Sequence, residues 1–114
     1  EGAGNPLVHP HRHCVGPYVK DGFLFGDFIV ASAYLTDMRA DYVGCLASPQ
    51  GWVRPYGDVA ISEAGAMECK SKCKGGGYAY FGLECPHANG AEVHCQCSNA
   101  LGGTMKADQY CEGA

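Results

Sequence analysis

Residues 62–77 have the sequence SEAGAMECKSKCKGGG, and this stretch decides how the chain folds. It predicts a helix that begins after Ser62, whose side chain can cap it, and ends at the three closing glycines. Cys69 and Cys73 are four residues apart, so both sulfurs lie on one face of that helix. Two sulfurs on one face can staple the helix to a sheet beneath it.

Two strands are predicted after the helix, over residues 78–85 and 92–97, joined by the loop 86–91. Side chains alternate along a strand, so Cys95 and Cys97 point to the same face. Both can therefore reach the helix cysteines without reversing the strand. The pattern predicts a small α+β, disulfide-rich fold with an antiparallel sheet and one packed helix.

The composition indicates a single exported domain. The chain has 114 residues, among them 17 glycines and 6 prolines, and only 18% are charged. Eight cysteines in so short a chain favour four disulfides and an oxidising compartment. We therefore expect a secreted, extracellular protein whose numbering begins after a removed signal peptide. The cysteines are Cys14, Cys45, Cys69, Cys73, Cys85, Cys95, Cys97 and Cys111.

Charge and hydropathy argue against two classes of partner. The net charge is −4, and the basic residues are scattered apart from Lys70, Lys72 and Lys74, so a nucleic-acid surface is not expected. The longest apolar stretch, residues 23–35, is too short to span a bilayer and contains Asp27. Membrane insertion is not expected either.

No motif supports catalysis or a cofactor. A glycosidase needs two carboxylates across a cleft, and the sequence gives no reason to pair any of its acidic residues. A cysteine nucleophile is disfavoured because an even number of cysteines in an exported chain indicates that every thiol is bonded. We therefore expect a non-enzyme without a cofactor.

The N-terminal region, residues 1–40, differs from the rest in composition. Residues 1–20 are rich in proline and glycine, which predicts an extended arm. Residues 22–35 are apolar at both parities of a two-residue period, which predicts a strand covered on both faces. A neighbouring subunit could cover the second face; a central place in a sandwich is the alternative. The predicted subunit contacts are Phe23, Phe25, Phe28, Ile29 and Val30.

Four motifs occur in order within residues 41–114, which we treat as the second region. They are YVGC at 42–45, Cys-x-x-x-Cys at 69–73, GYAYFGLE at 77–84 and CQCSNAL at 95–101. Together they resemble the WSC domain of fungal cell-wall stress sensors and extracellular carbohydrate-active proteins. The resemblance covers residues 41–113 and implies a PAN/apple-like fold with a role in binding wall or matrix polysaccharide.

The loop 48–58 contains the candidate carbohydrate site. In an extended conformation Trp52, Arg54 and Tyr56 would project to one side, with Asp58 nearby. A sugar can stack its C–H face on an aromatic ring while its hydroxyls bond charged groups. The alternative for Tyr56 is a place in the core, because the WSC pattern has a packed residue there.

The histidines offer a weaker candidate site. His9, His11 and His13 alternate along the arm and would share a face that could bind Zn²⁺ or Cu²⁺. The alternative is an exposed polar arm, and we expect no metal. His87 and His94 are isolated in sequence and are expected to be structural or exposed.

Cys14 needs a partner because the WSC-like region contains seven cysteines, an odd number. The family resemblance leaves Cys85 over, so we expect a bond between Cys14 and Cys85 within the chain. A bond from Cys14 to another molecule is the alternative, and it would link subunits.

These observations predict a secreted carbohydrate-binding module of the WSC type that acts at a cell wall or extracellular matrix, with a polysaccharide or glycan as partner. The alternative is a structural subunit of an extracellular filament or coat, a homo-oligomer assembled through the N-terminal arm and the apolar strand.

Overall fold

Helix α1 (Glu63–Gly75) begins and ends where the sequence predicts. The hydroxyl oxygen of Ser62 accepts a hydrogen bond of 3.0 Å from the N–H of Gly65. At the other end, the N–H of Gly76 donates to the carbonyls of Lys72 and Cys73. The polar cap and the glycine stop therefore fix both ends of the helix.

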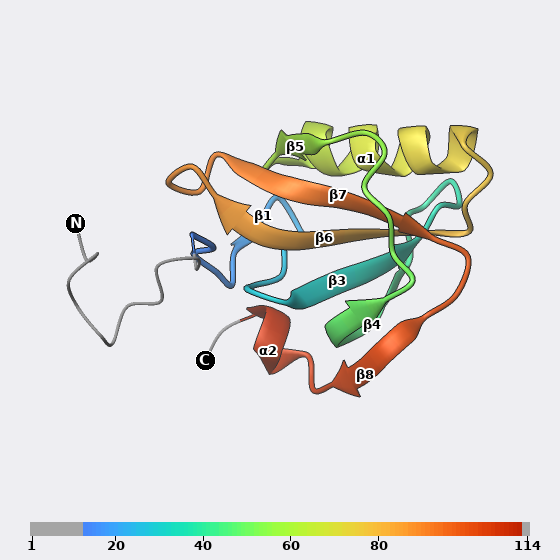
Figure 1. Ribbon diagram of the computed structural model, residues 1–114. Helices are drawn as coiled ribbons and strands as arrows, with labels where there is room; N and C mark the ends of the chain where they lie inside the picture. The colour runs from blue at the N-terminus through green and yellow to red at the C-terminus, as the bar shows by residue number, and fades with distance from the viewer. Residues whose placement is uncertain (1–12, 113–114) are drawn as a thin grey trace.

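Six strands form one antiparallel sheet in the order β5-β7-β6-β3-β4-β8, as the computed structural model shows (Figure 1). The structure describes residues 13–112. The strands of this sheet are β3 (Val30–Leu35), β4 (Tyr42–Gln50), β5 (Asp58–Ala60), β6 (Tyr80–His87), β7 (Glu92–Ser98) and β8 (Gly102–Lys106). A short hairpin, β1 (Val19–Lys20) with β2 (Phe23–Leu24), precedes the sheet, and α2 (Gln109–Glu112) follows it. The predicted α+β disulfide-rich class is confirmed at this level.

The core lies between α1 and one face of the sheet. Leu83 pairs with Cys95 and Phe81 with Cys97 across β6 and β7, and all four side chains are fully buried. The disulfides Cys69–Cys95 and Cys73–Cys97 join these strands to the helix. The predicted staple between helix and sheet is confirmed.

The remaining disulfides tie the two ends of the described chain to the sheet. Cys14 bonds Cys85, and Cys45 bonds Cys111, so all eight cysteines are paired within one chain. The predicted intrachain bond from Cys14 is confirmed. Four disulfides indicate an oxidising, extracellular environment. Among residues 13–112, no helix is both long enough and apolar enough to cross a bilayer.

The prediction of one strand over residues 22–35 is wrong. The segment contains β2, an isolated bridge between Asp27 and Val30, and then β3. The chain turns at Gly26 and Ile29, which both have positive φ, and this breaks the run. β3 lies between β6 and β4, and its residues 31–34 are buried, so the chain itself covers this strand. The two regions predicted on either side of residue 40 share one sheet.

Candidate functional site

The face of the sheet opposite α1 carries polar side chains at one end. Glu84 pairs with His94 and Gly82 pairs with Gln96, in positions that alternate with the core residues of β6 and β7. Side chains alternate across a strand, so these residues face away from the helix. We call this the open face. The candidate functional site lies on this face.

Glu84 is fixed on the open face by three donors. One carboxylate oxygen, Oε2, accepts from the backbone N–H of Ile29 at 2.9 Å. The other, Oε1, accepts from Nε2 of Gln96 at 3.2 Å and lies 3.1 Å from Nδ1 of His94. A buried carboxylate that is held in this way has one orientation. Glu84 therefore positions both Gln96 and His94.

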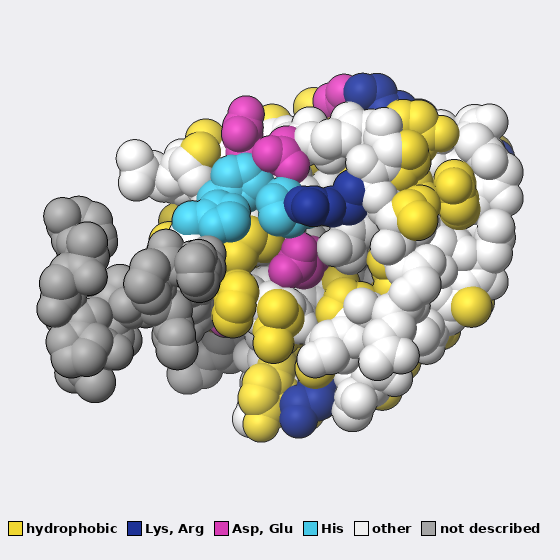
Figure 2. Space-filling model, viewed as in Figure 1, with side chains coloured by type: hydrophobic (Ala, Val, Ile, Leu, Met, Phe, Trp, Pro, Cys, Tyr) yellow, Lys and Arg dark blue, Asp and Glu magenta, His cyan; other side chains and the backbone are white. Residues whose placement is uncertain are grey.

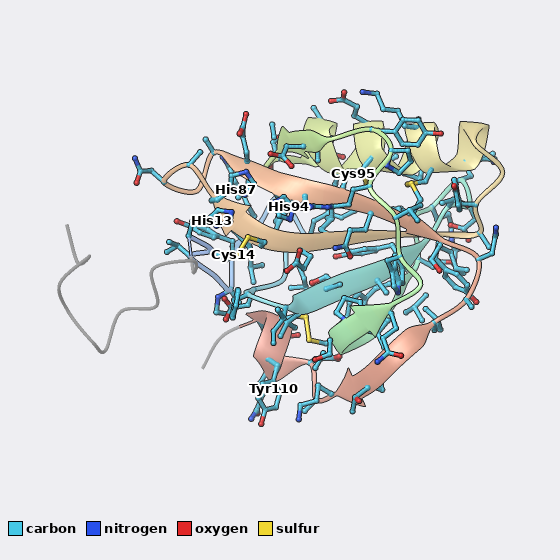
Figure 3. All side chains as sticks on the ribbon, viewed as in Figure 1. His13, Cys14, His87, His94, Cys95 and Tyr110 are labelled. Atoms are coloured by element: carbon cyan, nitrogen blue, oxygen red, sulfur yellow. A yellow bond between two sulfur atoms is a disulfide. The ribbon has the colours of Figure 1, made fainter. Side chains whose placement is uncertain are left out.

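His13, His87 and His94 form a cluster on the open face, which we call the histidine cluster. Figure 2 shows these side chains gathered with acidic side chains beside them, and Figure 3 shows the three rings together near Cys14. The ring centroids of His87 and His94 are 4.9 Å apart, and that of His13 is 5.4 Å from His87 and 6.2 Å from His94. Three imidazoles from positions far apart in the sequence thus lie close together in the fold.

Two more carboxylates border the histidine cluster. Oδ2 of Asp58 lies 2.9 Å from Nε2 of His87, and Oε1 of Glu92 lies 3.7 Å from the same nitrogen. The carbonyl of Cys85 accepts from Nδ1 of His87 at 2.7 Å. Burial lowers the pKa of His87, but the hydrogen bonds to Cys85 and Asp58 outweigh it and raise the pKa above its ordinary value. The surroundings of His87 therefore favour positive charge.

A hollow of about 340 Å³ adjoins the histidine cluster. Ile29 and Ser48 in its wall both have positive φ, of 49° and 48°, and the N–H of Ser48 donates to the carbonyl of Ile29. A left-handed backbone is costly for a branched residue such as isoleucine and is typical of functional sites. Glu84 lines the hollow and also holds the ring of His94 in place. The lining residues are Ile29, Ser48, Pro49, Gln50, Glu84 and Gln96.

The structure does not bring the four predicted carbohydrate-site residues together in one row. Trp52 is half-buried with its ring against Gly82, and Arg54 is exposed. Tyr56 packs against the core with its hydroxyl near Gly76, in agreement with the alternative that the sequence left open. Asp58 faces His87.

The predicted subunit contacts are placed in different environments. Phe25 is fully buried inside the chain and cannot contact a neighbour in this fold. Phe23, Phe28 and Val30 are half-buried, whereas Ile29 is exposed at the hollow. His9 and His11 lie outside the described residues.

Sequence reasoning missed the histidine cluster because it treated His87 and His94 as isolated. A signal was nevertheless present in the predicted disulfide. A bond between Cys14 and Cys85 brings His13, the neighbour of one cysteine, close to His87, two residues from the other. The hairpin of β6 and β7 then adds His94.

No protein-family model, curated protein or solved structure matches this chain. The function therefore has to be inferred from the residues and their geometry.

Proposed function

We propose that the protein is a secreted carbohydrate-binding module of the WSC type, with a PAN/apple-like fold, that holds a neutral wall or matrix polysaccharide on its open face. The observation that carries the proposal is the hollow between the end of β4 and the polar side chains of β6 and β7. The motif resemblance of residues 41–113 and the disulfide framework support the same class of function.

The size and lining of the hollow suit a sugar ring. Ligand sites typically measure about 300–1,000 Å³, so a volume of about 340 Å³ matches a small ligand or one unit of a polymer. Ile29 and Pro49 give apolar walls against which C–H groups can pack. Gln50, Glu84 and Gln96 offer amide and carboxylate groups to hydroxyls.

One acceptor at the hollow is left over. Nε2 of Gln96 donates to Glu84, but the side-chain amide oxygen Oε1 of Gln96 is buried and has no hydrogen-bond partner among residues 13–112. A buried acceptor without a donor is costly. A hydroxyl donor from a ligand or from water would satisfy it, whereas an anion would not.

Charge then selects the kind of polysaccharide. Glu84 is at the hollow, Asp58 and Glu92 lie beyond it, and the net charge of the chain is −4. Acidic polymers such as uronate or sulfated chains are repelled by these carboxylates. Neutral glucans, or polymers of neutral amino-sugar derivatives, are the favoured class.

Gln50→Ala tests this proposal, since Gln50 is exposed and pairs with Gly102 only through the backbone. We expect the wild type to bind an insoluble neutral polysaccharide and not an acidic one. Loss of one side-chain hydrogen bond, about 1 kcal/mol, should weaken binding about fivefold. Depletion assays over a panel of β-glucan, chitin, cellulose and polyuronate, all in EDTA, measure this.

The matched control is Gln109→Ala, an equivalent change at an exposed residue of α2. It should bind like the wild type. A wild type that binds no neutral polysaccharide would overturn the proposal. So would equal binding by the Gln50 and control variants.

Fewer observations now support the filament alternative. The apolar run that suggested a second covered face is enclosed within the chain, because β3 pairs on both sides and its central residues are buried. Cys14 pairs internally and links no neighbour. What remains is the two edge strands of the sheet, β5 and β8, either of which an added strand could extend.

A further inference from the structure

The neighbours of His87 determine which of its ring nitrogens carries a hydrogen. A carbonyl oxygen can only accept, so the 2.7 Å contact with Cys85 places the hydrogen on Nδ1. In a neutral ring Nε2 is then an acceptor, yet it lies 2.9 Å from the carboxylate of Asp58, which also only accepts. Two acceptors this close require a positive charge on Nε2 or between the two groups.

His94 repeats the arrangement. Its Nδ1 lies 3.1 Å from Oε1 of Glu84, an acceptor, so Nδ1 carries the hydrogen. Its Nε2 is 3.9 Å from Oδ1 of Asp58. The Nε2 atoms of both rings are thus directed to the same carboxylate, and each opposite nitrogen donates to a fixed oxygen. Histidines that bind metals are typically oriented in this way.

His13 brings a third imidazole to the same place. One ligand atom each from His13, His87 and His94 lies within 4.8 Å of the others. The sulfur of Cys85 is equally close but belongs to a disulfide, so it is not a thiolate ligand. Asp58 and Glu92 offer carboxylate oxygens around His87. The available donors are therefore imidazole nitrogen and carboxylate oxygen.

We propose that the histidine cluster and Asp58 bind one divalent transition-metal ion. Three imidazole nitrogens and one carboxylate oxygen are four donors of the kinds that Zn²⁺ prefers, and Cu²⁺ and Ni²⁺ also accept imidazoles. Ca²⁺ and Mg²⁺ take mainly oxygen ligands and should bind poorly. Glu84 is a positioning residue, because it holds the ring of His94 without facing the ion.

The site has a structural consequence for the N-terminal arm. His13 is the residue before Cys14, whereas the other ligands stand on the sheet at β5, β6 and β7. An ion shared by His13 and the sheet fastens the arm a second time, beside the disulfide. Metal binding therefore stabilises the folded protein, since the unfolded chain lacks the assembled site.

Calorimetric titration of the disulfide-intact full chain with ZnCl₂ at neutral pH tests the proposal. We expect one equivalent of Zn²⁺ to bind and no comparable binding of Ca²⁺ or Mg²⁺. His87→Ala and His94→Ala should abolish binding at this stoichiometry. Glu84→Gln should weaken it about 10–100-fold, as is typical for groups that orient a ligand.

The control is the double variant His9→Ala/His11→Ala, which removes the other histidines of the arm and should bind like the wild type. Long-range ¹⁵N NMR of the imidazoles supplies a readout independent of stability. Zn²⁺ should shift the Nε2 resonances of His87 and His94 while Nδ1 stays protonated. In Glu84→Gln the His94 signals should lose this fixed tautomer.

Three results would overturn the proposal. One is the absence of Zn²⁺ binding, which would mean that the positive charge beside Asp58 is a proton. Another is binding lost in His9→Ala/His11→Ala but kept in the His87 and His94 variants, which would place the ion on the arm. The third is metal shifts at Nδ1 instead of Nε2. Glycan binding is measured in EDTA, so its failure and this one are distinguishable.

Discussion

Gly82 allows the single tryptophan of the chain to rest on the open face. A Cβ atom at this position would lie 3.0 Å from Cζ3 and 3.3 Å from Cε3 of Trp52. Because Gly82 pairs with Gln96, the indole sits beside a residue that lines the hollow. The missing side chain of Gly82 thus decides where Trp52 can lie.

Gly82→Ala should displace the indole and destabilise the fold by about 1 kcal/mol, at the low end for overpacking because Trp52 is only half-buried and can move. The emission of Trp52 should shift to longer wavelength, and the urea midpoint should fall. Gly75→Ala, where an added Cβ meets nothing within 4 Å, is the control: it should leave the emission unchanged and should not lower the urea midpoint, because alanine is favoured over glycine in a helix. An unchanged spectrum in Gly82→Ala would show that the ring is not held against the sheet.

Tyr34 connects the hairpin to the sheet. Its hydroxyl, at the core side of β3, accepts a hydrogen bond of 2.7 Å from the backbone N–H of Leu24 in β2. Its ring stacks on Phe81 of β6 at a centroid distance of 5.1 Å. Burial raises the pKa of Tyr34 to about 12, and the hydrogen bond from Leu24 only partly opposes this. One side chain therefore links three strands.

Tyr34→Phe should change the alkaline stability of the protein. The folded state holds the phenolic proton more tightly than the unfolded chain, whose tyrosine pKa is about 10. The associated stability is complete below pH ~10 and is lost as pH rises through about 12. The variant should lose about 1 kcal/mol at neutral pH with its hydrogen bond, and its stability should fall less steeply above pH ~10.

Urea denaturation at a series of pH values measures both effects. Tyr42 also has a raised pKa, from burial and from Asp108, so part of the alkaline slope should remain. The control is Tyr110→Phe, at a residue that is half exposed. A slope in Tyr34→Phe equal to that of the wild type would contradict the prediction.

The disulfide Cys14–Cys85 joins the N-terminal arm to β6, an inner strand of the sheet. It closes a loop of 71 residues, and the N–H of Val15 also donates to the carbonyl of Pro86. The disulfide also holds His13, the residue before Cys14, in the histidine cluster. Whole-molecule stability and the composition of the site therefore depend on one covalent bond.

The double variant Cys14→Ala/Cys85→Ala should lose about 4 kcal/mol of unfolding free energy, the loop-entropy value for a ring of this size. Its Zn²⁺ affinity should also fall, because His13 is then held less firmly. The wild type should migrate at 12.0 kDa without reductant, and the variant should remain a monomer of that size. A ladder of larger disulfide-linked species in the wild type would support the filament alternative instead.

Local chemistry in the sequence determined the elements around the cysteines. The cap at Ser62, the glycine stop and the four-residue spacing of Cys69 and Cys73 act within a few residues, so they predicted α1 and its staple correctly. Counting the cysteines predicted that Cys14 needs a partner, and the resemblance to the WSC domain implied that this partner is Cys85. Alternation within β7 placed Cys95 and Cys97 on one face, from which both reach the helix cysteines.

Only the tertiary structure decided where the apolar run and the histidines lie. The apolar content of a strand does not show whether the same chain or a neighbouring subunit covers it. The positive φ at Ile29 also interrupts the strand, although the apolar sequence continues through this residue. The histidine cluster combines an arm with two strands that are more than seventy residues further along the chain. Sequence proximity carries no information about such contacts, because disulfide closure and strand register bring these side chains together.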